Sequence, residues 1–262
     1  MTSTTARDFL PVLMEHLDGL YGFAYRVTNS QTRAKEVSRE VLLRAYAGRA
    51  KLPEPTQVFA WLVKIAVHVI GRLGDGERMT FKYLDETIRG DPTQVTRTGA
   101  LSDPERQGLL WELRQGCLTA VLSCLSEGER MAFVLVVMMK QRSAVAAATL
   151  GISQTALKVR LSRAKKKIAD YLAPRCEHVH PRNPCRCPSR LGVALSKGFI
   201  QDLPHGEVSL RKASQQPFMP AAPLRDVVAI YETLPPPTGD EELLAGLREE
   251  LLSGAWDELI GH

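Results

Sequence analysis

The chain has few cysteines, few aromatic residues and no long apolar run. Five cysteines in 262 residues and no signal sequence among the charged first fifteen suggest reduced thiols rather than a disulfide framework. The longest apolar run, from Met131 to Met139, has nine residues and is too short to cross a bilayer. We therefore expect a cytoplasmic protein without a membrane segment.

Motifs of the common catalytic sites are also missing. The sequence contains no glycine-rich phosphate loop, no paired metalloprotease histidines and no nucleophile motif. His178 and His180, with the cysteines around them, leave a catalytic metal site open as an alternative, although Glu177 is the only carboxylate nearby. We expect a protein that is not an enzyme.

Charge is distributed unevenly along the chain. Residues 1–175 hold 26 basic and 17 acidic side chains, whereas residues 176–262 hold 8 basic and 12 acidic ones. A cationic body with an anionic tail is typical of a nucleic-acid-binding protein with an acidic appendage.

The spacing of apolar residues predicts an all-α fold with two small helical domains joined by a flexible linker. The expected helices span about 8–28, 32–49, 57–73, 105–125, 126–140, 143–150 and 153–172. This places the domains at 5–74 and 105–173, with a linker at 75–104 that has room for one short helix. Residues 174–262 form an irregular extension in which prolines exclude long helices, except for a terminal amphipathic helix over 240–260.

Residues 142–168 show the pattern of a helix-turn-helix. Ala147 precedes Gly151 by four residues, and Ser153 is placed to cap the helix that follows. That helix has one apolar face and carries six cations in ten residues, a density that suits a phosphate backbone. We assign base contacts to Gln154, Thr155 and Lys158 at its start. Phosphate contacts are assigned to Arg160, Arg163 and Lys165.

The two helical modules, in this order, resemble bacterial RNA polymerase sigma factors of the extracytoplasmic-function group. The matching segments are LYGFAYRVT (20–28), REVLLRAY (39–46), FAWLVKIA (59–66) and the whole of 125–167. The resemblance implies a factor that binds core RNA polymerase, opens promoter DNA at the −10 element with its first module and reads the −35 element with its second. A stand-alone helix-turn-helix regulator without a polymerase partner is the alternative.

Site residues in the first module follow from this resemblance. Lys64, His68 and Arg72 would contact DNA at the −10 element. The family's second helix usually begins with an acidic patch that engages the polymerase, and here Glu36 and Glu40 retain that acidic character. Arg33 and Lys35 depart from the pattern.

The extension adds two expectations. Cys176, His178, His180, Cys185 and Cys187 offer thiols and imidazoles within twelve residues, the ligands that zinc or copper(I) prefers. Cysteine-rich tails on some sigma factors of this group sense metals, while an unliganded tail is the alternative. Between Asp240 and Glu258 the sequence has seven carboxylates and one cation, so this segment is a candidate intramolecular inhibitor of the cationic body.

Overall fold

The computed structural model describes residues 6–73, 79–88, 103–196 and 226–234, together with residues 245–247, 249, 250, 253 and 256. Every regular element in these ranges is a helix, and their only β contact is an isolated bridge between Cys176 and Cys185. The all-α prediction is confirmed. No described helix is long and apolar enough to cross a bilayer. All five cysteines are free thiols.

Contacts divide the chain into two compact units. One unit contains Met1–Glu77, Met131–Arg160 and Pro235–His262, and the other contains Arg78–Arg130 and Leu161–Leu234. Neither unit coincides with a domain predicted from the sequence, since each combines separate stretches of the chain.

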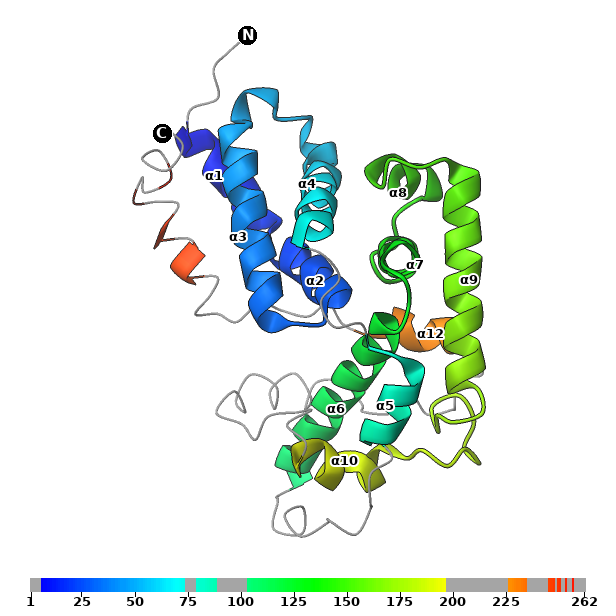
Figure 1. Cartoon of the computed structure of the whole chain (residues 1–262). Coiled ribbons are helices and arrows are strands. Elements are labelled where there is room, and N and C mark those ends of the chain that lie inside the picture. The colour runs from blue at the N-terminus through cyan, green and yellow to red at the C-terminus, as the bar shows by residue number, and fades with distance from the viewer. Residues whose placement is uncertain are drawn as a thin grey trace. The chain divides into compact units, whose positions relative to one another are not determined.

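The first unit begins with four helices (Figure 1). These are α1 (Ala6–Glu15), α2 (Leu17–Thr28), α3 (Gln31–Ala47) and α4 (Val58–Leu73), with short 3-10 turns at Arg49–Lys51 and Pro55–Gln57. Helices α2, α3 and α4 pack against one another. Their facing sides bury apolar residues such as Phe23, Val41 and Leu62, none of which is exposed.

The predicted first helix is wrong in one respect, because it is two helices rather than one. The chain bends at His16, whose side chain makes no capping hydrogen bond, and α2 starts at Leu17. The amide of His16 bonds to the carbonyl of Leu13 at 3.1 Å, a tightened turn that ends α1. The next boundary follows the usual capping rule: Ser30 is extended and its side chain accepts a hydrogen bond from the Arg33 amide at the start of α3.

Helix α6 (Asp103–Ser123) is the central helix of the second unit. Helices α5 (Phe81–Ile88) and α10 (Cys187–Ser196) pack against it. The predicted linker therefore contains one short helix, α5, in its described part. Tyr171 and Arg175, at and after the end of α9 (Gln154–Leu172), both hold Asp85 of α5, the tyrosine hydroxyl donating to its carboxylate at 2.8 Å.

The extension packs on α6 more closely than its proline content suggests. Leu191 and Ala194 of α10 join Leu109, Leu110 and Leu113 of α6 in one buried cluster. Pro188 lies in the first turn of α10, where a missing amide hydrogen costs nothing. The short helix α12 (Val227–Glu232) belongs to the same unit. It is anchored by Tyr231, whose hydroxyl donates to the Leu118 carbonyl at 3.1 Å. The terminal helix predicted over 240–260 lies mostly outside the described residues.

We expect Leu191→Ala to lower the free energy of unfolding by about 2–4 kcal/mol, because Leu191 is 1% exposed and its removal leaves a cavity against α6. Urea unfolding followed by circular dichroism measures this loss. Ser189→Ala, at an exposed position of the same helix, is the control. An equal effect of both substitutions would show that α10 is not packed through Leu191.

Candidate nucleic-acid interface

The turn between α8 (Ser143–Thr149) and α9 has the geometry that a helix-turn-helix requires. Gly151 adopts φ +64°, the left-handed conformation favoured by glycine. The amide of Ile152 bonds to the Ala147 carbonyl at 3.0 Å and that of Gly151 to the Ala148 carbonyl at 3.2 Å. These two bonds form a Schellman motif, which ends α8.

Helix α9 then begins at a cap. The Ser153 hydroxyl accepts a hydrogen bond from the amide of Ala156 at 3.1 Å, as predicted from the sequence. Leu157, Ala164 and Ile168 are at most 1% exposed, so one face of the helix is buried. Leu161, which the apolar pattern also placed on that face, is only half-buried.

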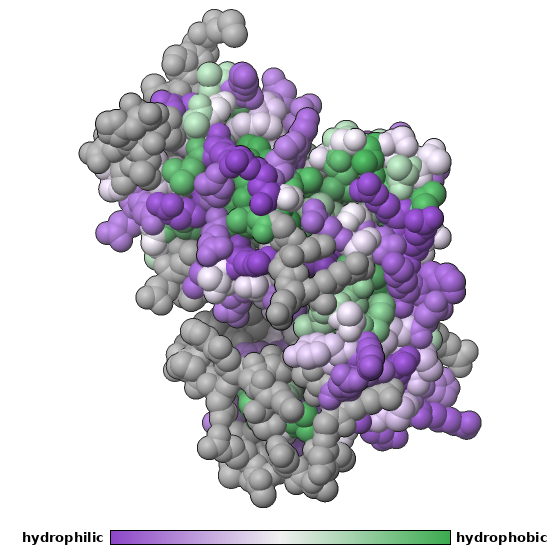
Figure 2. Space-filling model, in the orientation of Figure 1, coloured by the Kyte–Doolittle hydropathy of each residue, from purple (hydrophilic) through white to green (hydrophobic). Residues whose placement is uncertain are grey.

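The opposite side of α9 is polar and open to solvent. Figure 2 shows hydrophilic residues along this helix. Of the six DNA contacts predicted on α9, five are exposed and Arg160 is half-buried. The exposed ones are Gln154, Thr155, Lys158, Arg163 and Lys165. The start of α9 thus presents short polar groups and its middle presents cations, an order that suits base contacts followed by phosphate contacts.

Two of the six cations counted in α9 have partners within the protein. Lys166 pairs with Asp170 one turn later at 2.9 Å, and Lys167 pairs with Glu129 of α7 (Glu127–Phe133) at 2.8 Å. The sequence analysis counts both lysines as part of the cationic surface. Because Glu129 is only 7% exposed, Lys167 attaches α9 to α7, and the charge available to a polyanion is smaller than the count suggests.

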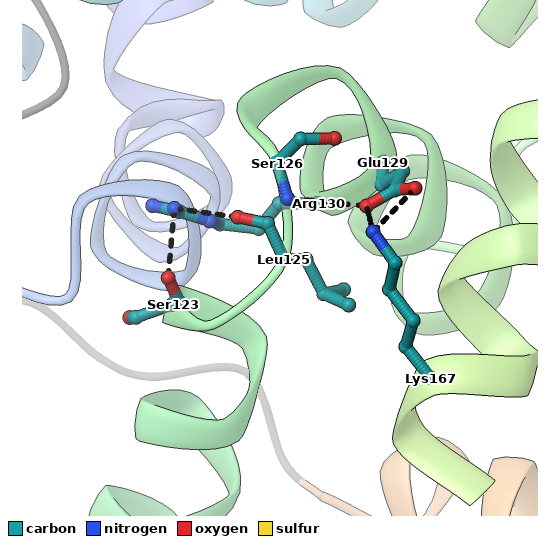
Figure 3. A network of polar contacts seen from close by, with 6 residues as sticks. All are labelled: Ser123, Leu125, Ser126, Glu129, Arg130 and Lys167. Carbon is teal, nitrogen blue, oxygen red and sulfur yellow. Dashed lines mark hydrogen bonds and ion pairs between the residues drawn. The ribbon is translucent and has the colours of Figure 1, made fainter. Parts of the chain in front are cut away.

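Glu129 belongs to a polar network at the start of α7 (Figure 3). Its carboxylate accepts a hydrogen bond from the Ser126 amide at 3.1 Å as well as two from Lys167. Arg130, the next residue, donates to the carbonyls of Ser123 and Leu125, both at 3.2 Å. The network satisfies the backbone groups of the α6–α7 turn and fixes the C-terminal half of α9 to it.

Electrostatics of Glu129 agree with this arrangement. Burial alone would raise the pKa of its carboxyl, but hydrogen bonds from Lys167 and Ser126 outweigh burial and lower the pKa below its ordinary value. The charged form is therefore the one that the folded state stabilises.

The π-helical turn at Val134–Met138 is a feature that the sequence did not indicate. It follows α7 directly inside the longest apolar run, where one continuous helix to residue 140 was predicted. The amide of Met139 bonds to the carbonyl of Val134, five residues earlier, at 2.9 Å. Lys140 next adopts φ +54°, which turns the chain toward α8.

In the first module, Lys64, His68 and Arg72 are all exposed and follow one another at four-residue spacing on α4. The structure therefore places them on one side of the helix. The imidazole Nδ1 of His68 lies 3.0 Å from the Lys64 carbonyl. Phe59 and Trp61, near the start of α4, are half-buried.

Glu36 and Glu40 lie one turn apart on α3. Glu36 is exposed, whereas Glu40 is half-buried and accepts a hydrogen bond from Arg44 at 2.7 Å. Arg44 thus offsets the charge of Glu40, and Glu36 is the more open of the two carboxylates.

The cysteine- and histidine-containing segment brings only some of its predicted ligands together. One potential ligand atom from each of Glu177, His178 and Cys187 lies within 4.8 Å of the other two. The His178 Nε2 and Cys187 Sγ atoms are 3.4 Å apart. Cys176 and Cys185 face each other through a backbone bridge and are not members of this group, and His180 is exposed with its Nδ1 hydrogen-bonded to the Arg182 amide.

Burial dominates the protonation of this group. It lowers the pKa of His178 to about 4, with a further contribution from Arg114, and raises the pKa of Cys176 to about 11. It also raises the pKa of the Cys187 thiol far above its ordinary value. At neutral pH the imidazole is therefore neutral and both thiols are protonated in the metal-free protein. Glu177 also accepts a hydrogen bond from the Cys187 amide at 2.7 Å and so caps α10.

Comparisons with known proteins agree with both modules. Residues 12–73 match the model of sigma-70 region 2, and residues 115–168 match that of sigma-70, region 4. The chain is 25% identical over 167 residues to the ECF RNA polymerase sigma factor SigE of Mycolicibacterium smegmatis. These matches and this relative support a sigma factor of the extracytoplasmic-function type.

The match to this relative covers 62% of the chain and 60% of the relative. No solved structure is significantly similar to this chain. The extension, residues 174–262, lies outside both family matches.

Sequence reasoning missed two residues that shape the site. Glu129 stands three residues after Ser126, and this Ser-x-x-Glu spacing is the signature of a capping box that could have revealed it. Glu177 was noted only as an isolated carboxylate, although its position next to His178 made it a candidate ligand.

We expect Glu129→Gln to reduce the free energy of unfolding by about 1–2 kcal/mol at neutral pH, because Lys167 loses its charged partner. The lowered pKa means that this stabilisation is present above the ordinary value of 4.5 and is lost as pH falls through the folded-state value. Unfolding measured from pH 7 to pH 3 should therefore show the parent and variant converging in acid.

Lys166→Gln is the matched control, because it removes an exposed pair worth less than about 0.5 kcal/mol. A Glu129→Gln variant as stable as the parent at neutral pH would contradict the role given to this network.

Proposed function

We propose that the chain is a non-catalytic transcription-initiation factor that binds core RNA polymerase and directs it to promoter DNA. The observation that carries this proposal is the start of α9: a Schellman turn at Gly151 and a cap at Ser153 precede exposed Gln154, Thr155 and Lys158. This start lies within the match to region 4, and the same chain matches region 2. Such a factor would act in the cytoplasm, where polymerase and DNA are found.

In this proposal the second module reads the −35 element. Gln154, Thr155 and Lys158 contact base edges in the major groove, because the N-terminal end of the second helix enters the groove in this motif. Arg163 and Lys165 neutralise phosphates farther along the helix, together with Arg160.

The first module would open the DNA at the −10 element. Lys64, His68 and Arg72 form an exposed polar row on α4 that can follow a strand backbone. Half-buried Phe59 and Trp61 leave part of each ring for stacking on a base. Glu36 and Glu40 of α3 would contact the polymerase.

A stand-alone helix-turn-helix regulator shares the DNA contacts but needs no polymerase. Binding of the purified chain to core RNA polymerase therefore separates the two functions. We expect a stable complex that survives gel filtration, and a chain that elutes apart from the core enzyme at every concentration would favour the regulator.

Replacing Arg163 by Ala should weaken binding to promoter and random DNA alike, because a phosphate contact carries no sequence information. Binding measured by fluorescence anisotropy across a salt series should show a salt slope smaller by about one. Arg106→Ala, which removes an exposed cation from α6, is the control. Unchanged affinity and salt slope for Arg163→Ala would contradict the assignment.

We propose as well that the extension holds a metal ion, zinc or copper, at His178 and Cys187, with Glu177 as a third ligand. For tetrahedral zinc, an imidazole nitrogen and a thiolate sulfur on the same ion are about 3.5 Å apart. The 3.4 Å between His178 Nε2 and Cys187 Sγ fits this value. A bound ion would hold the start of α10 to the preceding turn. The thiols of Cys176 and Cys185 lie in the same segment but outside this close group.

Protein purified without chelator or tag should contain about one zinc or copper ion per chain by elemental analysis, because thiolate and imidazole bind these ions tightly. Cys187→Ser should lose the ion. Cys124→Ala, which removes a buried thiol outside the extension, should keep it. A parent protein that binds neither metal after incubation and desalting would exclude the site.

A further inference from the structure

Part of the acidic C-terminal segment packs against α3 within the first unit. Figure 1 shows its described residues, in orange-red, beside this helix. Two side chains of α3 contact this segment: Tyr46 meets Trp256, and Arg39 pairs with Glu250. Arg39 and Tyr46 are seven residues apart and so lie on one side of α3.

Trp256 is a fully buried large side chain of this segment. Its side chain is 1% exposed and its ring meets the Tyr46 ring edge-on, with centroids 6.1 Å apart. Leu247, in the same segment, is 2% exposed. A tryptophan that buries its whole side chain removes a large apolar area from water, so this residue anchors the segment.

Glu250 gives the contact its orientation. One carboxylate oxygen, Oε2, accepts hydrogen bonds from Arg39 Nε at 2.9 Å and from Trp256 Nε1 at 3.3 Å. Both partners of the ion pair are more than two-fifths exposed, at 46% and 42%, so the pair contributes little energy of its own. It fixes the position of the indole instead.

The side of α3 that contacts the C-terminal segment is adjacent to the residues assigned to polymerase binding. Glu36, Arg39, Leu43 and Tyr46 follow one another at spacings of three, four and three, which places them along one helix side. Glu36 is exposed and precedes Arg39 by one turn. A polymerase surface that contacts Glu36 along α3 would therefore meet Glu250 and Trp256.

We propose that the C-terminal segment around Leu247, Glu250 and Trp256 is a built-in competitor that occupies the polymerase-binding side of α3. This inference rests on the proposed function. The segment is part of the same chain, so it rebinds at a high effective concentration after each release. Only the fraction of molecules with a free α3 can bind polymerase, which raises the apparent dissociation constant by the inverse of that fraction.

Affinity of the full-length chain for core RNA polymerase tests the competition directly. Trp256→Ala and, separately, Glu250→Ala free α3, so we expect the apparent dissociation constant to fall, by roughly 10-fold for Trp256→Ala and less for Glu250→Ala. Glu249→Ala is the matched control, because it removes the same charge from an exposed neighbouring residue and should leave the affinity unchanged.

Hydrogen exchange gives a second measurement that does not depend on the variants. In the parent, amides of residues 245–256 should exchange faster once polymerase is bound, because the segment is displaced. Equal affinities of the parent and both variants, weaker binding by Trp256→Ala, or unchanged exchange in the complex would each overturn the competition while leaving the sigma-factor function in place. Absence of polymerase binding by the parent and every variant would overturn the proposed function and this inference together.

Discussion

The α8–α9 turn is the constraint on which the proposed DNA-binding surface depends. Gly151 in the left-handed conformation ends α8, and Ser153 begins α9 two residues later. This fixes the rotation of α9, so that Leu157, Ala164 and Ile168 are buried while Lys158, Arg163 and Lys165 remain exposed. A residue that resists φ > 0 at position 151 would cost about 1–2 kcal/mol and disturb this division of faces.

The ion pair of Lys167 with the buried Glu129 complements the turn. The turn sets where α9 starts, and the pair holds its C-terminal half to α7. The result is a helix supported at two places, whose exposed middle is available for a phosphate backbone. Cations that hold the helix and cations that face solvent are therefore different residues, although they are neighbours in the sequence.

Much of the fold could be predicted from the sequence, because apolar periodicity and capping residues act locally. Gly151 and Ser153 mark boundaries through their own backbone preferences, and the structure confirms the turn and the cap. The break at His16 was missed because apolar residues continue across it. The partner of Lys167 was missed because Glu129 is 38 positions away, and charge counting cannot pair distant residues.

The extension was the part least accessible to sequence reasoning. Its prolines suggested a loose segment, yet Leu191 and Tyr231 are 1% and 0% exposed because their partners are on α6. Its acidic end suggested attraction by charge, whereas the contact with α3 is anchored by an aromatic residue, Trp256, with one exposed ion pair beside it. Of the metal-ligand candidates, His178 and Cys187 lie close together with Glu177, whereas Cys176 and Cys185 are paired through a backbone bridge. Sequence spacing alone could not predict this division.

The central proposal is that this chain works through RNA polymerase rather than on DNA alone. Permanganate reactivity of thymines in the −10 region of a target promoter reports strand opening directly. The account predicts reactive thymines only when core polymerase and this chain are both present. Reactive thymines with the chain alone, or none with the two together on a promoter that they bind, would contradict it.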